Sequence, residues 1–285
     1  MLVGLNDILN KAKENKCAIA GFNVFGYEDA ASVVSAAESL NVPVILMTNS
    51  DAVKHMPISI LGGILRKLAK ESIVDVCVHL DHGKSFDEIM EALRAGYSSV
   101  MYDGSQLPLE DNIRETKKVV DIAKYFGVSV EGEIGSVGYS DPAIEAKARY
   151  TKPEEAKRFV EETGVDAVAV AIGTLHRMEA QEASIQFDLL KEIESLVDIP
   201  LVLHGSTGVK NGDLESLSQT GISKVNIGTA LRMAFGHTMR QEFDLYPLEF
   251  DRLKLFKQPM VEVEKIAIKK MKILGANAYN KEASC

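Results

Sequence analysis

Short apolar runs alternate with amphipathic stretches along most of the 285-residue chain. The runs are continuous rather than alternating, which is typical of strands buried on both faces of a parallel sheet. Between them, apolar residues recur at helical spacing, and several stretches end at a glycine suited to a helix C-terminus. The predicted strands are 17–23, 43–47, 73–80, 98–102, 128–134, 166–172, 200–203 and 224–227. The predicted helices are 1–16, 27–40, 58–70, 86–95, 109–126, 153–163, 187–196, 213–220 and 230–241.

Eight strand–helix units in fewer than 300 residues predict an α/β fold, a (β/α)8 TIM barrel formed by one domain over residues 1–285. A doubly wound open sheet is the alternative, and the lack of a glycine-rich dinucleotide loop after the first strand argues against it. Residues from about 246 to 285 form a C-terminal helical extension, with a helical pattern over 250–274. We expect this extension to pack outside the barrel or on a partner subunit.

Charge and cysteine content narrow the class of protein. The net charge of −9 argues against a general nucleic-acid binder, but it permits anionic small molecules held by backbone N–H groups. No apolar run approaches membrane length, and residues 1–16 have an amphipathic pattern that differs from a signal peptide. Cys17, Cys77 and Cys285 have neither paired spacing nor zinc spacing, so a reducing, cytoplasmic compartment is expected.

Active-site residues of such barrels lie at the carboxyl ends of the strands. Three histidines meet this condition, because His82 ends the third strand, His176 follows the sixth and His204 ends the seventh. Three imidazoles that converge from three loops match a catalytic zinc site with a fourth position open for water or substrate. The alternative is three separate loop histidines, each satisfied by its own hydrogen bonds.

The remaining polar residues can be sorted by the same condition. Asp81, beside His82, is a candidate for proton transfer. Asp103, Glu131 and Glu133 also end strands, whereas His79 lies inside the third strand and is expected in the core or behind the ligands. His55 and His237 fall in helical patterns and are expected on the surface or in packing contacts.

Two glycine-containing loops resemble anion cradles, because barrels often bind phosphate with the loops after the seventh and eighth strands. Two further polar residues near the start of the chain, Asn23 and Ser50, complete the predicted substrate contacts. The candidate phosphate-binding residues of the two loops are Gly205, Ser206, Thr207, Asn226, Ile227, Gly228 and Thr229.

Several motifs occur in a fixed order that resembles the class II, zinc-dependent ketose-bisphosphate aldolases. The chain is most similar to the branch of short tagatose-bisphosphate and fructose-bisphosphate aldolases, from about Ala18 to the helix after Thr229. The motifs are His-Leu-Asp-His-Gly (79–83), Tyr-Asp-Gly-Ser (102–105), Val-Glu-Gly-Glu-Ile-Gly (130–135), Ala-Ile-Gly-Thr-Leu-His (171–176), Leu-His-Gly-Ser-Thr-Gly (203–208) and Val-Asn-Ile-Gly-Thr (225–229).

The resemblance implies reversible cleavage of a ketose 1,6-bisphosphate to dihydroxyacetone phosphate and glyceraldehyde 3-phosphate. It makes His82, His176 and His204 the zinc ligands, and it makes Asp81 the acid/base on the C4 hydroxyl. Asp103 and Glu133 match positions that hold zinc in a resting arrangement or bind a second metal. Zinc would stabilise the enediolate as a Lewis acid, without a Schiff-base lysine.

The resemblance also implies partners. Members of the family use a monovalent cation (Na⁺ or K⁺) near the phosphate, and they are usually homodimers or homotetramers. Some tagatose-type members work with a non-catalytic companion subunit.

The chain departs from the family pattern in two loops. Arg177 stands where the family usually has glycine, and Met178-Glu179-Ala180 replaces a Gly-x-Tyr pattern. A guanidinium there would either hold an anion in bidentate fashion or crowd the phosphate and cation site. In the loop after the fifth strand, Asp141 is the nearest match to the C3 proton-transfer carboxylate, and Glu145 is its rival.

Three functions stay open at this point. The first is an aldolase for tagatose or fructose 1,6-bisphosphate, or for a different anionic ketose. The second is a zinc-binding barrel that serves as a companion subunit without activity. A metal-dependent hydrolase is the third, although such barrels generally place a His-x-His pair on the first strand, where this chain has only Asn23.

Overall fold

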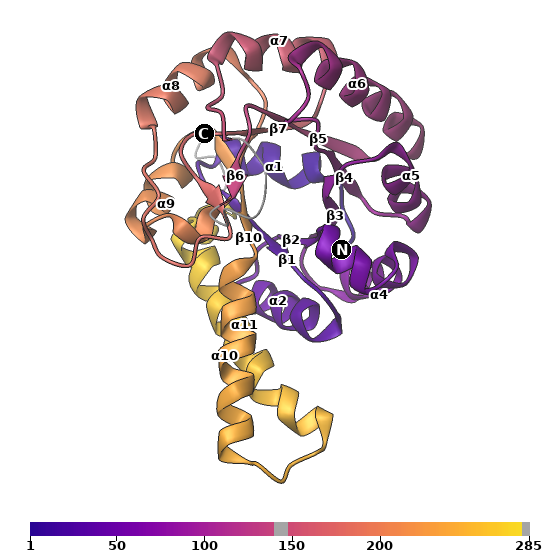
Figure 1. The fold of residues 1–285 in the computed structure, drawn as a ribbon, viewed down its shortest axis with the longest axis vertical. Coiled ribbons are helices and arrows are strands. Elements are labelled where there is room, and N and C mark those ends of the chain that lie inside the picture. Colours follow the sequence, from indigo (N-terminus) through magenta and orange to yellow (C-terminus); the bar gives the residue numbers. More distant parts are fainter. Residues whose placement is uncertain (140–147, 281–285) are drawn as a thin grey trace.

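Parallel strands formed by the predicted apolar runs close into a barrel in a computed structural model that describes residues 1–139 and 148–280 (Figure 1). Around the barrel the strands follow the order β1-β10-β9-β7-β5-β4-β3-β2, so the first and last strands pair and close the sheet. The TIM-barrel prediction is therefore confirmed. The barrel strands are β1 (Ile19–Asn23), β2 (Val44–Thr48), β3 (Val76–Gly83), β4 (Ser99–Tyr102), β5 (Ser129–Ile134), β7 (Ala167–Val170), β9 (Leu201–Leu203) and β10 (Ile222–Ile227).

Helices follow the strands and cover the outside of the barrel (Figure 1). They are α2 (Tyr27–Leu40), α4 (Ile58–Glu71), α5 (Phe86–Ala95), α6 (Leu109–Phe126), α7 (Pro153–Thr163), α8 (Phe187–Leu196), α9 (Asn211–Ser218) and α10 (Thr229–Leu245). As predicted, α5, α6 and α7 end at Gly96, Gly127 and Gly164, which adopt the left-handed conformation.

Side chains on the strands alternate between two apolar cores. In β2, Val44 and Leu46 point outward toward the helices, whereas Ile45 and Met47 point into the barrel. Helix α1 (Leu5–Glu14) packs its apolar face, including Leu5 and Ile8, against this inner core. The inner core thus has an apolar helix at the end opposite the loops that follow the strands.

Additional short elements lie among the loops at the carboxyl ends of the strands. Strands β6 (Gly138–Tyr139) and β8 (Leu175–His176) form a small parallel sheet of their own, which places Leu175 and His176 above the barrel. Helix α3 (Ser50–His55) begins after Asn49, whose side chain accepts hydrogen bonds from two backbone N–H groups of its first turn. A short 3-10 helix, η1 (Ser206–Gly208), follows β9, and a second one among the described residues, η2 (Ala276–Ala278), lies after α11.

The C-terminal part of the chain forms a helical arm. Helix α11 (Arg252–Ile273) runs back along α10 and packs on α2, and the paired helices project beyond the barrel (Figure 1). The arm therefore begins within α10, ahead of residue 246. No helix in residues 1–139 and 148–280 is long and apolar enough to cross a lipid bilayer.

Candidate active site

The three predicted histidine ligands converge above the carboxyl ends of the strands. The ring centroids of His82 and His176 lie 4.9 Å apart, those of His82 and His204 lie 4.7 Å apart, and the third pair is separated by 5.8 Å. Their potential ligand nitrogens all lie within 4.8 Å of one another. The structure therefore brings together three residues that are separated by up to 122 positions in the sequence.

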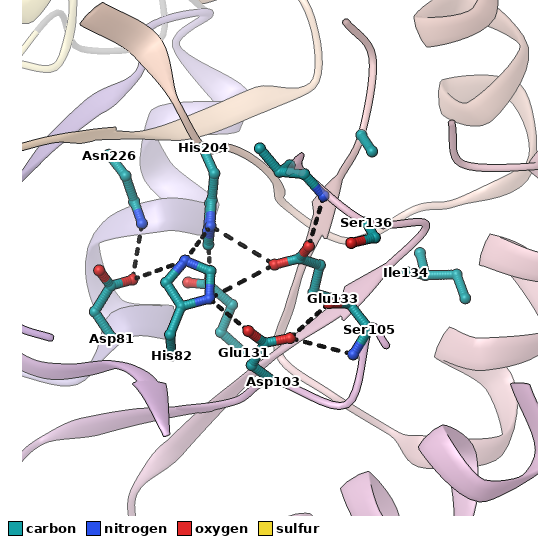
Figure 2. Close-up of polar contacts among 12 residues, drawn as sticks. Asp81, His82, Asp103, Ser105, Glu131, Glu133, Ile134, Ser136, His204 and Asn226 are labelled. Atoms are coloured by element: carbon teal, nitrogen blue, oxygen red, sulfur yellow. Dashed lines mark hydrogen bonds and ion pairs between the residues drawn. The ribbon is translucent and has the colours of Figure 1, made fainter. Parts of the chain in front are cut away.

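Carboxylates orient two of these rings (Figure 2). Nδ1 of His82 lies 2.8 Å from Oδ2 of Asp103, and Nε2 of His204 lies 2.9 Å from Oε1 of Glu131. Each carboxylate accepts a hydrogen bond from the N–H of one ring nitrogen, so in the neutral imidazole the other nitrogen carries the lone pair. These remaining nitrogens, Nε2 of His82 and Nδ1 of His204, face each other at 3.0 Å.

A fourth group at this point is the buried carboxylate of Glu133. Its Oε2 has no hydrogen-bond partner among the described residues, and it lies 3.8 Å from Nδ1 of both His82 and His204. His82, Asp103 and Glu133 form a second group whose ligand atoms are close enough to hold a metal ion. Imidazole nitrogens with carboxylates behind them, plus an orphaned buried carboxylate oxygen, fit a divalent transition-metal ion.

The charges of the site shift several pKa values. Burial opposes ionisation of His82, but the nearby carboxylates of Asp81 and Asp103 overcome it and raise the His82 pKa to about 10. Burial, reinforced by the charge of Asp103, raises the pKa of Glu133 to about 8. Burial and the neighbouring imidazoles lower the pKa values of His176 and His204 well below the usual range. At neutral pH the metal-free site thus holds protons on His82 and Glu133.

This protonation predicts that metal binding displaces protons. A cation can bind Nε2 of His82 only after the ring loses one of its two protons, so we expect Zn²⁺ to release at least about one proton at pH 7. The apparent affinity for Zn²⁺ should rise with pH between 7 and 9, because fewer protons then remain to be displaced. Titration calorimetry of the metal-free protein in two buffers of different ionisation enthalpy measures this number, and a value near zero would contradict a His82 ligand.

Asp81 lies beside the histidines, and two amides hold its carboxylate. Nδ2 of Asn23 donates to Oδ2 at 2.8 Å, and Nδ2 of Asn226 donates to Oδ1 at 3.0 Å. Burial disfavours the charge of Asp81, but His82, followed by His204, Lys224 and the hydrogen bond from Asn23, lowers its pKa on balance. Asp81 is therefore an ionised, fixed carboxylate with the properties of a general base.

A buried ionic cluster lies inside the barrel beneath His204. Oε2 of Glu131 is 2.6 Å from Nζ of Lys224 and 3.6 Å from Nε2 of His79, and all three side chains are fully buried. Nδ1 of His79 lies 2.8 Å from the hydroxyl of Ser99. Lys224 thus balances the carboxylate that orients His204, and His79 lies in the core behind the ligands, as expected.

The walls of the catalytic pocket come from the predicted loops. Of the predicted substrate contacts, the lining of the pocket includes Asn23, Ser50, Arg177, Gly205, Ser206, Thr207, Asn226, Gly228 and Thr229. The hydroxyl of Ser206 donates to the backbone oxygen of Asn226 at 2.5 Å, which ties the two loops together. Ile227 differs, since its side chain packs in the outer apolar core, and it stays a predicted contact through its backbone.

Two residues of the pocket other than glycine have backbones in the left-handed region. Arg177 has φ 60° and His82 has φ 55°, a conformation that residues with a Cβ rarely adopt. Glycine adopts it without strain, so Arg177 retains the backbone that a glycine would have at this position and adds a guanidinium. Nη2 of Arg177 donates to Oδ2 of Asp51 at 3.1 Å, on the rim of the pocket.

The predicted C3 proton-transfer group, Asp141, and its rival Glu145 lie outside the described residues.

The sequence did not indicate three contacts of the site. These are the hydrogen bond from Asn23 to Asp81, the contact of Glu131 with His204 and the ion pair of Glu131 with Lys224. Lys224 carried a signal, because it is a charged residue at the start of a predicted strand of a buried parallel sheet. His55 and His237 are exposed, as predicted.

The comparisons with known proteins agree with this geometry. The chain resembles the YdjI aldolase from Escherichia coli K12, with 32% identity over 99% of this chain and 100% of that chain and a TM-score of 0.87. Its fold also matches a fructose-bisphosphate aldolase (Fba) from Campylobacter jejuni, with a TM-score of 0.85 and 22% identity over 98% of this chain and 97% of that chain. A family model for class II fructose-bisphosphate aldolase matches residues 3–278. The chain, with its histidine cluster and ionised Asp81 at the mouth of the barrel, belongs to the class II fructose-bisphosphate aldolase family.

Proposed function

We propose that this protein is a Zn²⁺-dependent aldolase that reversibly cleaves a phosphorylated ketose to dihydroxyacetone phosphate and an aldehyde. The substrate is of the tagatose or fructose 1,6-bisphosphate type, and the aldehyde is then glyceraldehyde 3-phosphate. One observation carries the proposal: an ionised Asp81, held by two amides, lies directly beside three histidines that converge on one point.

The residues of the chain supply positioning and proton transfer. In cleavage, Asp81 accepts the proton of the C4 hydroxyl as the bond between C3 and C4 breaks. The buried Oδ1 of Asn226 has no partner among the described residues, so it offers an acceptor for a substrate hydroxyl. The loops 205–207 and 226–229 bind the phosphate through their backbone N–H groups, which in the second loop lie at the start of α10.

His82, His176 and His204 would hold the metal ion, with Asp103 and Glu133 as an alternative set. When bound, the ion supplies Lewis-acid stabilisation of the negative charge that develops on the substrate oxygens. We also expect a monovalent cation near the phosphate.

The test is release of dihydroxyacetone phosphate from tagatose and fructose 1,6-bisphosphates by the zinc-loaded protein, followed with a coupled assay. We expect turnover that a chelator removes and Zn²⁺ restores. His82→Ala, His176→Ala and His204→Ala should each lower bound zinc and activity together, whereas His55→Ala, an exposed histidine outside the pocket, should change neither. Stoichiometric zinc in an inactive His176→Ala protein would argue against His176 as a ligand.

The companion-subunit function predicts a different result, namely bound zinc without cleavage of any ketose phosphate. The intact Asp81 and its two amide donors oppose it, because a barrel that only binds zinc has no use for a fixed base.

We further propose that the protein is a homodimer or homotetramer. The tip of the helical arm exposes apolar side chains, among them Phe243, Leu248 and Phe250 at 51%, 91% and 93%. Apolar groups of this size at one end of a projecting arm favour contact with another subunit. Light scattering of the purified protein tests this proposal, and a monomer at micromolar concentration would contradict it.

A further inference from the structure

Helix α6 buries an amide behind the acidic side of the active site. The helix packs on β5, and Asn112 lies in its first turn with only 1% of its surface exposed. A buried amide costs free energy unless its polar groups are hydrogen-bonded. The partners of this amide therefore indicate what the side chain holds in place.

The two polar ends of the Asn112 side chain have different partners. Nδ2 donates to the backbone oxygen of Glu133 at 2.9 Å, and Oδ1 accepts from the hydroxyl of Thr116 at 3.0 Å. A carbonyl oxygen can only accept a hydrogen bond, so it requires the amide nitrogen to face β5. Thr116, one turn farther along α6 and fully buried, then satisfies the amide oxygen. The side chain is thus held in one orientation, with its donor on Glu133.

This hydrogen bond acts where one side of β5 loses its neighbouring strand. The pairing of β5 with β7 continues to Ile134, but its pairing with β4 ends at Tyr102 and Gly132, one residue before Glu133. The chain leaves β4 at this point, and α6 follows four residues after the next loop begins to turn. The main chain of Glu133 is therefore held by a side chain of α6 in addition to one strand.

The loop after β4 contacts the same amide. A Cβ on Gly104 would lie 2.2 Å from Oδ1 of Asn112, so only glycine lets the loop approach this closely. Gly104 lies between Asp103, which accepts from the His82 ring, and Ser105. The hydroxyl and the N–H of Ser105 donate to the carboxylate of Asp103 at 2.7 and 3.2 Å (Figure 2). The loop that holds Asp103 thus packs directly against the side chain that holds Glu133.

The separation of these two acidic residues matters for the metal centre. Asp103 and Glu133 belong, with His82, to the second group of potential metal ligands. Oε1 of Glu133 accepts from the N–H of Val137 at 3.1 Å, whereas Oε2 lies 3.8 Å from Nδ1 of both His82 and His204. A shift in the main chain of Glu133 would move this oxygen relative to the imidazoles. Groups that orient metal ligands usually change metal affinity by about tenfold to a hundredfold when they are removed.

We propose that Asn112 is a positioning residue of the metal centre. It holds the main chain of Glu133 and the loop of Asp103 at a fixed separation, so that the carboxylates around His82 keep the arrangement that binds the metal ion. Asn112 does not line the catalytic pocket and acts through the two carboxylates. This inference rests on the proposed zinc-dependent function and adds a residue to the support of its site.

The first test is the affinity of Asn112→Ala for Zn²⁺. We expect the dissociation constant of the metal-free protein for Zn²⁺ to rise by about tenfold or more, because the carbonyl of Glu133 loses its donor. The constant is measured by competition with a chromophoric chelator, at a temperature at which both proteins are fully folded. The visible absorption of the Co²⁺-loaded variant should also differ from that of the wild type, since the spectrum reports the arrangement of the ligands.

Thr163→Val is the matched control for a general loss of stability. Thr163 is buried at the end of α7, and its hydroxyl donates to the backbone oxygen of Phe159 at 2.6 Å. The end of α7 precedes β7, so this hydrogen bond lies at the amino ends of the strands, away from the histidines. We expect Thr163→Val to lower the unfolding midpoint in urea and to leave the dissociation constant for Zn²⁺ unchanged. An equal loss of zinc affinity in both variants would overturn the inference.

Gly104→Ala tests the same contact from the other side. Its methyl group should push the amide away from Glu133 and weaken zinc binding by about tenfold. In Gly104→Ala/Asn112→Ala the amide is gone, so the double variant should bind zinc about as tightly as Asn112→Ala.

Three results would count against these expectations. Wild-type zinc affinity in Asn112→Ala, or in Gly104→Ala should the first variant fail to fold, would overturn the inference. Losses that multiply in the double variant would also overturn it, because the two residues would then act independently. A wild-type protein that binds no Zn²⁺ would instead overturn the proposed function on which the inference rests.

Discussion

Asp81→Ala is expected to lower kcat for ketose cleavage by at least about a hundredfold and up to about ten thousandfold, the usual range for a lost acid/base group. The carboxylate is the ionised group beside the three histidines, and its two amide donors cannot take up a proton in its place. The measurement is the rate of dihydroxyacetone phosphate release by the purified variant at saturating ketose bisphosphate.

Two further readouts separate a lost base from a damaged site. Zinc content should stay stoichiometric, because Asp81 belongs to neither group of potential metal ligands. Exchange of the C3 proton of dihydroxyacetone phosphate with solvent should also continue, since that proton is handled by another group. If exchange and cleavage fall by the same factor, Asp81 acts on the whole site rather than on the C4 hydroxyl alone.

Lys224→Met is expected to lower the free energy of unfolding by about 3–5 kcal/mol, the usual cost of breaking a buried ion pair from one side. Nζ of Lys224 lies 2.6 Å from Oε2 of Glu131, and neither side chain is exposed to solvent. Methionine fills a similar volume but leaves the carboxylate of Glu131 without its cation. The measurement is urea unfolding of the metal-free protein, so that zinc binding does not contribute.

The double variant Lys224→Met/Glu131→Gln is the matched control. It removes both charges, so it should recover much of the stability that Lys224→Met loses. Its zinc affinity should nevertheless fall by about tenfold to a hundredfold, because the group that orients His204 has been altered. A single variant as stable as the wild type would show that the pair contributes nothing to the folded state.

The apolar pattern predicted the fold well because parallel strands covered by helices must be apolar throughout. The strand of residues 43–47 is observed at Val44–Thr48, and the helix of residues 109–126 is observed at its predicted bounds. The sequence did not predict α3 or the β6–β8 pair. These elements contain few residues, and their apolar residues do not recur at helical or strand spacing. Their existence depends on caps such as Asn49 and on contacts between loops, which periodicity does not report.

The candidate site was predictable to the extent that barrel geometry places strand ends together. His82, His176 and His204 could be grouped because each ends or follows a strand. The partnership of Glu131 with Lys224 could not, because it depends on which side chains meet across the inside of the barrel, between β5 and β10. The left-handed backbone of Arg177 was also hidden, because a sequence shows residue type and not φ.

The closure of the barrel by β1 and β10 has a consequence for the moment at which a newly made chain becomes competent. Asn23 and Asn226, which hold Asp81, lie on these two strands, and Gly21 pairs with Asn226 in their register. Lys224, which balances the carboxylate that orients His204, also lies on β10. Because a domain generally folds as a unit, the chain should acquire affinity for metal and the capacity to cleave sugars together, once β10 has left the ribosome. A ribosome-bound chain that ends before residue 222 should then neither hold zinc in this site nor turn over substrate.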